Sequence, residues 1–155
     1  MKRILVIAAC VTSSLVIAII GILIAVGVTG WKAAVKAANE AAAIKTLTTI
    51  AEQQMLYYNS HRRTSYGTFD EMLKERLLDD RFSATTPVVE GYVFAMRVVP
   101  KSNTTQAGFA VNADPQVTDG LAATGKNHFY LDSDSKTIHV NSTQPATATD
   151  PPLGQ

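Results

Sequence analysis

The chain has 155 residues, of which 46% are hydrophobic and 17% charged, and its formal net charge is +1. This length fits one modest domain. The balance of 14 basic and 13 acidic side chains excludes the basic footprint of a nucleic-acid-binding protein, and a single cysteine permits no internal disulfide.

The first feature along the chain is an uncharged apolar stretch. After Lys2 and Arg3 the next charged residue is Lys32, so residues 4–31 carry no charge. At about 1.5 Å per residue, such a helix exceeds the roughly 30 Å hydrocarbon core of a bilayer. We therefore predict a transmembrane helix at 4–29.

The flanking segments suggest an orientation for this helix. Long domains translocate largely regardless of charge, so the short end, residues 1–3, is the predicted cytoplasmic stub. This predicts a single-pass protein of the bacterial inner membrane with a periplasmic C-terminal domain.

Cys10 follows Ile7-Ala8-Ala9, which resembles a lipobox, the site at which a lipoprotein is cleaved and acylated. The apolar run before it is, however, short for an export signal. A small apolar thiol within a helix is the favoured interpretation.

Small residues within the apolar stretch are candidate partner contacts. Ser13, Ser14, Gly21 and Gly27 would let another transmembrane helix approach closely. Trp31 falls where the membrane meets water, a common position for an amphipathic ring, and is the predicted interface anchor.

Residues 31–61 predict a continuation of the helix, because they are rich in alanine and contain neither Gly nor Pro after residue 30. Apolar residues recur there at spacings of three and four and predict a stripe that packs on the protein's own domain. The stripe comprises Ile44, Leu47, Ala51, Met55 and Tyr58, widened by Ile50 and Tyr57. The alanine-rich section 33–43 would instead let another helix approach closely.

The sequence pattern of residues 68–82 predicts a short helix, since Thr68 and Glu71 match a Thr-x-x-Glu capping box. The periodicity then changes to two, with Pro, Gly, Asn and Ser between the segments. The predicted strands are 91–99, 108–113, 128–132 and 137–141. The last 14 residues, rich in Pro, Thr and Ala, are predicted to be disordered.

The predicted fold class is α+β. A long N-terminal helix, transmembrane in one half and amphipathic in the other, packs on a small antiparallel sheet of about four strands. The predicted organisation is a stub at 1–3, a transmembrane helix at 4–29, an extracytoplasmic domain at 30–141 and a disordered tail at 142–155.

Three stretches carry a resemblance to a known family. They are VIAIIGILIAV at 16–26, AANEAAAIKTLTTI at 37–50 and HFYLDSDSKTIHV at 128–140. With them the chain resembles the superfamily of type IV pilins and type II secretion pseudopilins. The resemblance implies a pilin-like domain and assembly with other subunits.

The chain departs from this family at the processing site. Pilins carry a Gly-Phe-Thr-Leu-Ile-Glu run that is cut after the glycine and whose glutamate registers subunits during assembly. Alignment of the apolar runs places Ile7 at the glycine, Ala8 at the first mature residue and Thr12 at the glutamate. These departures favour an unprocessed accessory subunit over a filament protein.

Patterns typical of catalysis or of metal binding are sparse. The three histidines, His61, His128 and His139, are scattered, and no Gly-rich phosphate loop occurs. Residues 132–134, Asp-Ser-Asp, favour a hairpin turn over a calcium loop, which needs a glycine and a distal glutamate. The basic run 61–63 favours a solvated helix end over a phosphate site. The sequence predicts a non-enzyme without cofactor or metal.

The predicted function is a non-enzymatic, single-pass, membrane-anchored pilin-like protein, a structural or accessory subunit of a larger membrane or envelope complex. The alternative is a minor pilin or pseudopilin subunit of a type IV pilus or type II secretion filament. The expected partners are membrane lipid and other integral membrane protein subunits, or like subunits in a filament, and no nucleic acid.

Overall fold

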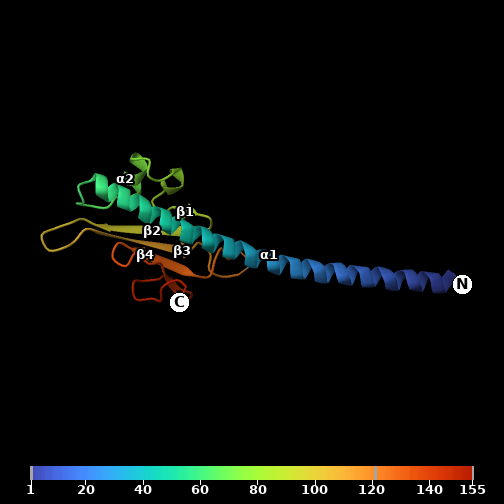
Figure 1. The fold of residues 1–155 in the computed structure, drawn as a ribbon. Coiled ribbons are helices and arrows are strands. Elements are labelled where there is room, and N and C mark those ends of the chain that lie inside the picture. The colour runs from blue at the N-terminus through green and yellow to red at the C-terminus, as the bar shows by residue number, and fades with distance from the viewer. Residues whose placement is uncertain (1, 121, 155) are drawn as a thin grey trace. The chain divides into compact units, whose positions relative to one another are not determined.

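A computed structural model describes the backbone of residues 2–120 and 122–154 and the side chains of residues 30–120 and 122–154. Two compact units, Met1–Val35 and Lys36–Gln155, are treated separately below. The elements, in chain order, are α1 (Lys2–Ser60), α2 (Phe69–Lys74), the 3-10 helix η1 (Asp80–Phe82), β1 (Val88–Val89), β2 (Tyr92–Val99), β3 (Gly108–Pro115), β4 (His128–Asp132) and β5 (His139–Asn141) (Figure 1).

The five strands form one antiparallel sheet in which each strand pairs with the next one along the chain (Figure 1). Phe94 of β2 lies opposite Ala113 of β3, and Val111 of β3 lies opposite Leu131 of β4. A long helix with an antiparallel sheet makes the fold α+β, as predicted. The additional strand, β1, has two residues, which is too short to show a period-two pattern.

The core lies between one face of α1 and one face of the sheet. Burial alternates along β3, where Phe109, Val111 and Ala113 are buried. On the helix, Leu47 and Ile50 are completely buried in the same cluster. Burial of apolar surface contributes roughly 25 cal/mol per Å², so this interface is the main source of the domain's stability.

The buried face of α1 differs from the predicted stripe. Its buried positions are Ala43, Leu47, Ile50, Gln54 and Tyr57. Leu47, Ile50 and Tyr57 belong to the predicted stripe, but at 100° per residue the centre of the buried face is rotated by about 50° from that of the stripe. The rotation arises because Gln54 lies in the middle of the buried face, where an apolar pattern does not place a polar side chain.

The capping box predicted before α2 is confirmed. The Glu71 N–H donates to Thr68 Oγ1 at 3.3 Å, and Glu71 Oε2 accepts from the Thr68 N–H at 2.8 Å. The helix is shorter than predicted and ends at Lys74, because Arg76 adopts a left-handed conformation with φ of 59°. Asp79 then caps η1 by accepting from the Arg81 N–H at 3.0 Å.

The C-terminal segment 142–154, predicted to be disordered, lies beside β5 in the structure. The Val140 N–H donates to the Pro151 carbonyl at 2.9 Å, and the Leu153 N–H donates to the Ile138 carbonyl at 2.7 Å. The prediction of disorder rested on a composition rich in Pro, Thr and Ala, whereas backbone groups make these contacts. The segment thereby covers part of an exposed sheet edge.

The membrane prediction requires correction. Within residues 30–120 and 122–154, no helix is long and apolar enough to cross a membrane. Lys32, Lys36 and Lys45 lie on the described part of α1, and each would cost about 2.5–3.5 kcal/mol at a bilayer centre. This finding conflicts with the predicted transmembrane and single-pass character and with the predicted inner-membrane location. Residues 4–29, which carried the prediction, lie outside these ranges.

Candidate functional site

The structure describes the side chain of the predicted interface anchor but not those of the predicted membrane contacts. Ser13, Ser14, Gly21 and Gly27 lie outside the residues whose side chains are described. Trp31 is described and is 72% exposed.

The members of the predicted core stripe lie at different depths. Leu47 is completely buried, and three others are partly buried against the core: Ile44, Ala51 and Tyr58. Met55 is 38% exposed and lies at the edge of a groove instead.

A carboxylate near the middle of α1 holds the loop that leads into β4. Glu40 Oε1 accepts from the Lys126 N–H at 2.8 Å and from the Asn127 N–H at 3.3 Å. Glu40 Oε2 accepts from Asn127 Nδ2 at 2.9 Å, and beside it Asn39 Nδ2 donates to the Thr124 carbonyl at 2.8 Å. Adjacent residues of α1 therefore fix three positions of this loop, Thr124, Lys126 and Asn127.

Tyr92 on β2 holds the same loop from the sheet side. Its hydroxyl donates to the Asn127 carbonyl at 2.9 Å. Burial, with the charges of Glu40 and Asp114, raises the pKa of Tyr92 well above its usual value, so the hydroxyl keeps its proton. Gly125 packs so closely on this hydroxyl that any side chain there would collide with it.

A buried amide joins α1 to the segment before α2. Gln54 is 0% exposed; its Nε2 donates to the Gly67 carbonyl at 2.6 Å and its Oε1 accepts from the Gly67 N–H at 2.9 Å. Nε2 also lies 3.0 Å from Sδ of Met96 on β2. Because a buried amide is costly without partners, this pairing explains a glutamine inside the core.

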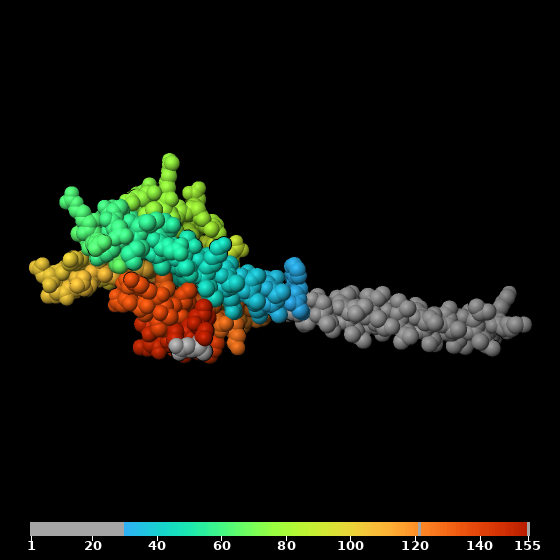
Figure 2. All heavy atoms as spheres, viewed as in Figure 1, coloured from blue at the N-terminus to red at the C-terminus, as the bar shows by residue number. Residues whose placement is uncertain are grey.

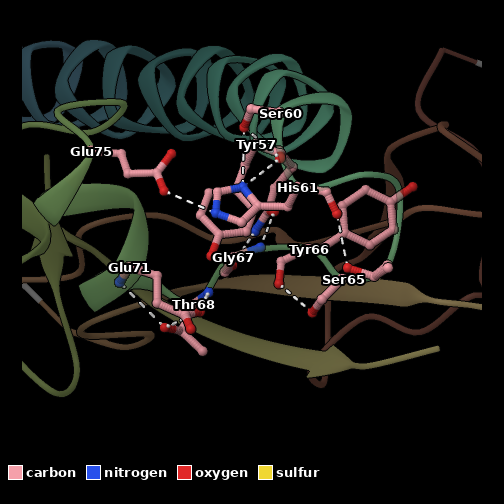
Figure 3. A network of polar contacts seen from close by, with 11 residues as sticks. Tyr57, Ser60, His61, Ser65, Tyr66, Gly67, Thr68, Glu71 and Glu75 are labelled. Carbon is pink, nitrogen blue, oxygen red and sulfur yellow. Dashed lines mark hydrogen bonds and ion pairs between the residues drawn. The ribbon is translucent and has the colours of Figure 1, made fainter. Parts of the chain in front are cut away.

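A polar network surrounds the end of α1 (Figure 3). The His61 ring stacks on Tyr57 with centroids 3.9 Å apart, and its Nε2 lies 3.1 Å from Oε1 of Glu75. Its Nδ1 lies 3.0 Å from both the Tyr57 carbonyl and the Ser60 hydroxyl. Burial, with the charges of Glu71 and Glu75, raises the pKa of Tyr57.

The other two residues of the basic run 61–63, Arg62 and Arg63, are exposed. Arg62 and Arg63 adopt left-handed conformations with φ of 54° and 59°, which ends α1 and turns the chain. The Lys101 N–H donates to the Thr64 carbonyl at 3.1 Å, which ties this turn to the loop between β2 and β3.

Two further groups of polar side chains need to be compared with known kinds of site: a His–Asp pair, as found beside catalytic nucleophiles, and an Asp-rich turn, as found in calcium loops. His128 Nδ1 lies 2.6 Å from Oδ1 of Asp114, but among the described hydrogen bonds no hydroxyl or thiol contacts this histidine. Asp132 Oδ1 accepts from the N–H groups of Asp134 and Ser135 at 3.1 and 2.7 Å, which makes this segment a hairpin turn. In the part of the chain with described side chains, no three potential metal ligands come together. The pairs join neighbouring strands and stabilise a turn.

Two grooves lie along opposite flanks of the packed part of α1, residues 40–60, whose outer face is uncovered in Figure 2. We name the first the Leu77 groove, a space of about 310 Å³ between α1 and the segment after α2; its lining includes Ala42, Lys45, Thr49, Leu77, Arg81 and Phe82. We name the second the Tyr66 groove, a space of about 300 Å³ between α1 and the turn after β4; its lining includes Ala51, Glu52, Met55, Tyr66, Phe109 and Lys136. These grooves are the best candidates for a functional surface.

Sequence reasoning missed the polar residues that join α1 to distant parts of the domain. Gln54, Asn39 and Glu40 contact partners that are distant along the chain, up to 87 residues away for Glu40. One local signal was available, because Asn39 and Glu40 are the only polar residues between Ala37 and Ala43. No local signal indicates the grooves, whose walls come from separate segments.

Comparisons of the chain with protein-family models, with curated proteins and with solved structures give no match.

Proposed function

We propose that the chain is a pilin-like, non-enzymatic protein that acts as a structural or accessory subunit of a larger protein complex. The observation that carries this proposal is the pair of grooves. The sheet covers one face of α1, and each flank of the helix opens into a groove of about 300 Å³ with apolar side chains in its lining. A partner element could pack beside the helix on either flank.

The order of the elements supports the pilin-like part of the proposal. A long N-terminal helix packs on an antiparallel sheet whose strands follow one another in sequence. The sheet closes with β4 and β5, formed by the stretch HFYLDSDSKTIHV on which the resemblance partly rests. The polar groups of this domain serve as clamps, which fits a subunit better than an enzyme.

Assembly of like subunits into a filament is the second candidate. It is favoured by the surface of α1 at the start of its packed part, where Ala37, Ala38 and Ala41 are exposed. Small side chains allow the backbones of two helices to approach closely. A surface of this kind would suit a second copy of the same helix.

The proposal is tested with the full-length chain, tagged at its C-terminus and expressed at its native level. Mild cross-linking and native mass measurement would give the composition of any complex. Ala42→Arg places a long cation in the Leu77 groove, and Ala95→Arg is the matched control because Ala95 is exposed on β2.

We expect wild type and Ala95→Arg to give one complex of fixed stoichiometry, and Ala42→Arg to lose it with an unchanged melting temperature. Fibres that contain this chain alone would support the second candidate. A monomer, or a set of proteins that varies between preparations, would overturn both.

A further inference from the structure

The Tyr66 groove has an apolar and aromatic floor. Tyr66 and Phe109 meet edge to face with centroids 4.8 Å apart, and Tyr58 stacks on Tyr66 at 4.5 Å. Ala51 and Met55 of α1 complete the floor, and Met55 is 38% exposed. Aromatic edges and a thioether are favourable partners for another aromatic ring, so the floor suits a bulky aromatic side chain.

The rim of this groove carries charges that select among partners. Glu52 lies on α1 and Lys136 on the turn after β4, and neither forms an ion pair within the described residues. Asp132 also lines the groove, but it is engaged with the backbone of its own turn. Because Glu52 and Lys136 lie on opposite walls, a partner whose aromatic residue has a cationic neighbour fits with that cation on the α1 side, beside Glu52 and away from Lys136.

The chain itself carries a side chain of this description. Trp31 is 72% exposed and is the single tryptophan of the protein. Val35, 38% exposed, lies one helical turn further along α1, so the two form a short apolar ridge. Lys32 directly follows the tryptophan.

We propose that the ridge of Trp31 and Val35 of one copy docks in the Tyr66 groove of a second copy, with Lys32 beside Glu52. This inference rests on the second candidate function, the assembly of like subunits, and names the contact that such an assembly would use. A helical ridge that enters a groove beside another helix is the usual packing of two helices. Because the two surfaces differ, the contact is heterologous and can continue from copy to copy.

The Leu77 groove is less suited to this ridge. Lys45, Arg81, Asp79 and Glu90 line it, and Arg81 already pairs with Asp79 at 2.8 Å. An indole placed there would be next to charged groups that remain hydrated. The two grooves therefore differ in the partners they accept.

The contact is tested by photocross-linking in the full-length chain. Trp31→p-benzoylphenylalanine carries the probe on an unlabelled chain, which is mixed with a 15N-labelled chain that keeps Trp31. Benzophenones insert into C–H bonds and favour methionine, so the probe should react with Met55. The expected product joins position 31 to the peptide 46–62 of the labelled copy.

A blocked groove provides the matched comparison. With Ala51→Arg in the labelled chain, the yield of cross-linked Met55, now in tryptic peptide 52–62, should fall at least tenfold. With Leu56→Arg, where Met55 lies in tryptic peptide 46–56, this yield should be unchanged. Leu56 is 55% exposed on the same helix and lines neither groove. Equal melting temperatures by circular dichroism would show that both variants fold.

Fluorescence of the single tryptophan gives a second measurement. The Ala51→Arg chain keeps Trp31 but lacks an open groove, and the Trp31→Phe chain has the groove but no tryptophan. When the second is added to the first, the emission should shift to shorter wavelength as the indole is buried.

Products at other segments, at lipid or detergent, within a single copy, or none at all would overturn the inference. So would an emission that does not change. The proposed function would still stand if such a chain formed a complex of fixed stoichiometry, so the two failures are distinguishable.

Discussion

The two ends of the packed part of α1 are attached to the domain in different ways. At one end Glu40 accepts hydrogen bonds from Lys126 and Asn127, 86 and 87 residues away in the chain. At the other end His61 pairs with Glu75, and both side chains are 39% exposed. The first attachment fixes backbone groups of a distant loop, whereas the second joins two half-exposed side chains that are close in sequence.

The difference shows where polar contacts specify this fold. A contact to backbone groups removes donors and acceptors that would otherwise remain unsatisfied, and its loss leaves them without partners. An exposed ion pair is replaced by water at little cost. Gln54, completely buried between the two ends, extends the comparison to the core.

The largest effect is expected at this buried amide. Gln54→Leu keeps a similar volume but leaves the N–H and the carbonyl of Gly67 unpaired, at about 1–3 kcal/mol for each group. We expect a loss of about 2–6 kcal/mol in the free energy of unfolding, measured by urea denaturation. Gln53→Leu, one position earlier, is the matched control and should change stability by no more than about 0.5 kcal/mol. Equal values for the two variants would contradict the role of Gln54.

The loop clamp should show the next largest effect. Glu40→Ala removes a charged acceptor from the loop before β4 and should cost about 1–3 kcal/mol. Hydrogen exchange at the Lys126 and Asn127 amides should accelerate while that of β2 stays unchanged. Glu52→Ala, on the exposed side of the same helix, should affect neither quantity. Unchanged exchange in the Glu40 variant would show that the clamp is unimportant.

The same contrast explains what the sequence could predict. Some features follow from residues close together in the chain, and each was predicted near its observed position. They are the capping box of Thr68 and Glu71, the packed part of α1 and four of the strands. The rotation of the buried face, β1 and both grooves depend on segments that only the fold brings together. Gln54 is the clearest case, because its burial is understandable only once Gly67 is placed beside it.

The capping box should give a smaller, pH-dependent effect. The Thr68 N–H, and then its hydroxyl, hold the pKa of Glu71 below its usual value. Since the folded pKa is lower than the unfolded one, near 4.3, this stabilisation is fully present above about pH 4.3 and is lost as pH falls through the folded pKa. Thr68→Ala should cost about 1 kcal/mol at pH 7.

The measurement is the free energy of unfolding against pH, from pH 7 to pH 3. Glu71→Gln keeps acceptor atoms without a titrating charge, so its decline in acid should be shallower than that of wild type. The decline should persist in part, because hydrogen bonds also lower the pKa values of Asp79 and Asp132. Curves that run parallel in wild type and variant would rule out the linkage.

The smallest effect is expected at the exposed end of α1. Glu75→Gln should change the free energy of unfolding by no more than about 0.5 kcal/mol, because both partners of its pair are 39% exposed. The contacts of the His61 ring also assign one of its protons. The Ser60 hydroxyl donates to the Tyr57 carbonyl, so Nδ1 of His61 faces two acceptors and carries a proton.

Ring 15N shifts of His61, recorded in wild type and Glu75→Gln, would show which nitrogens are protonated. A wild-type ring protonated only at Nε2 would refute the placement of a proton on Nδ1.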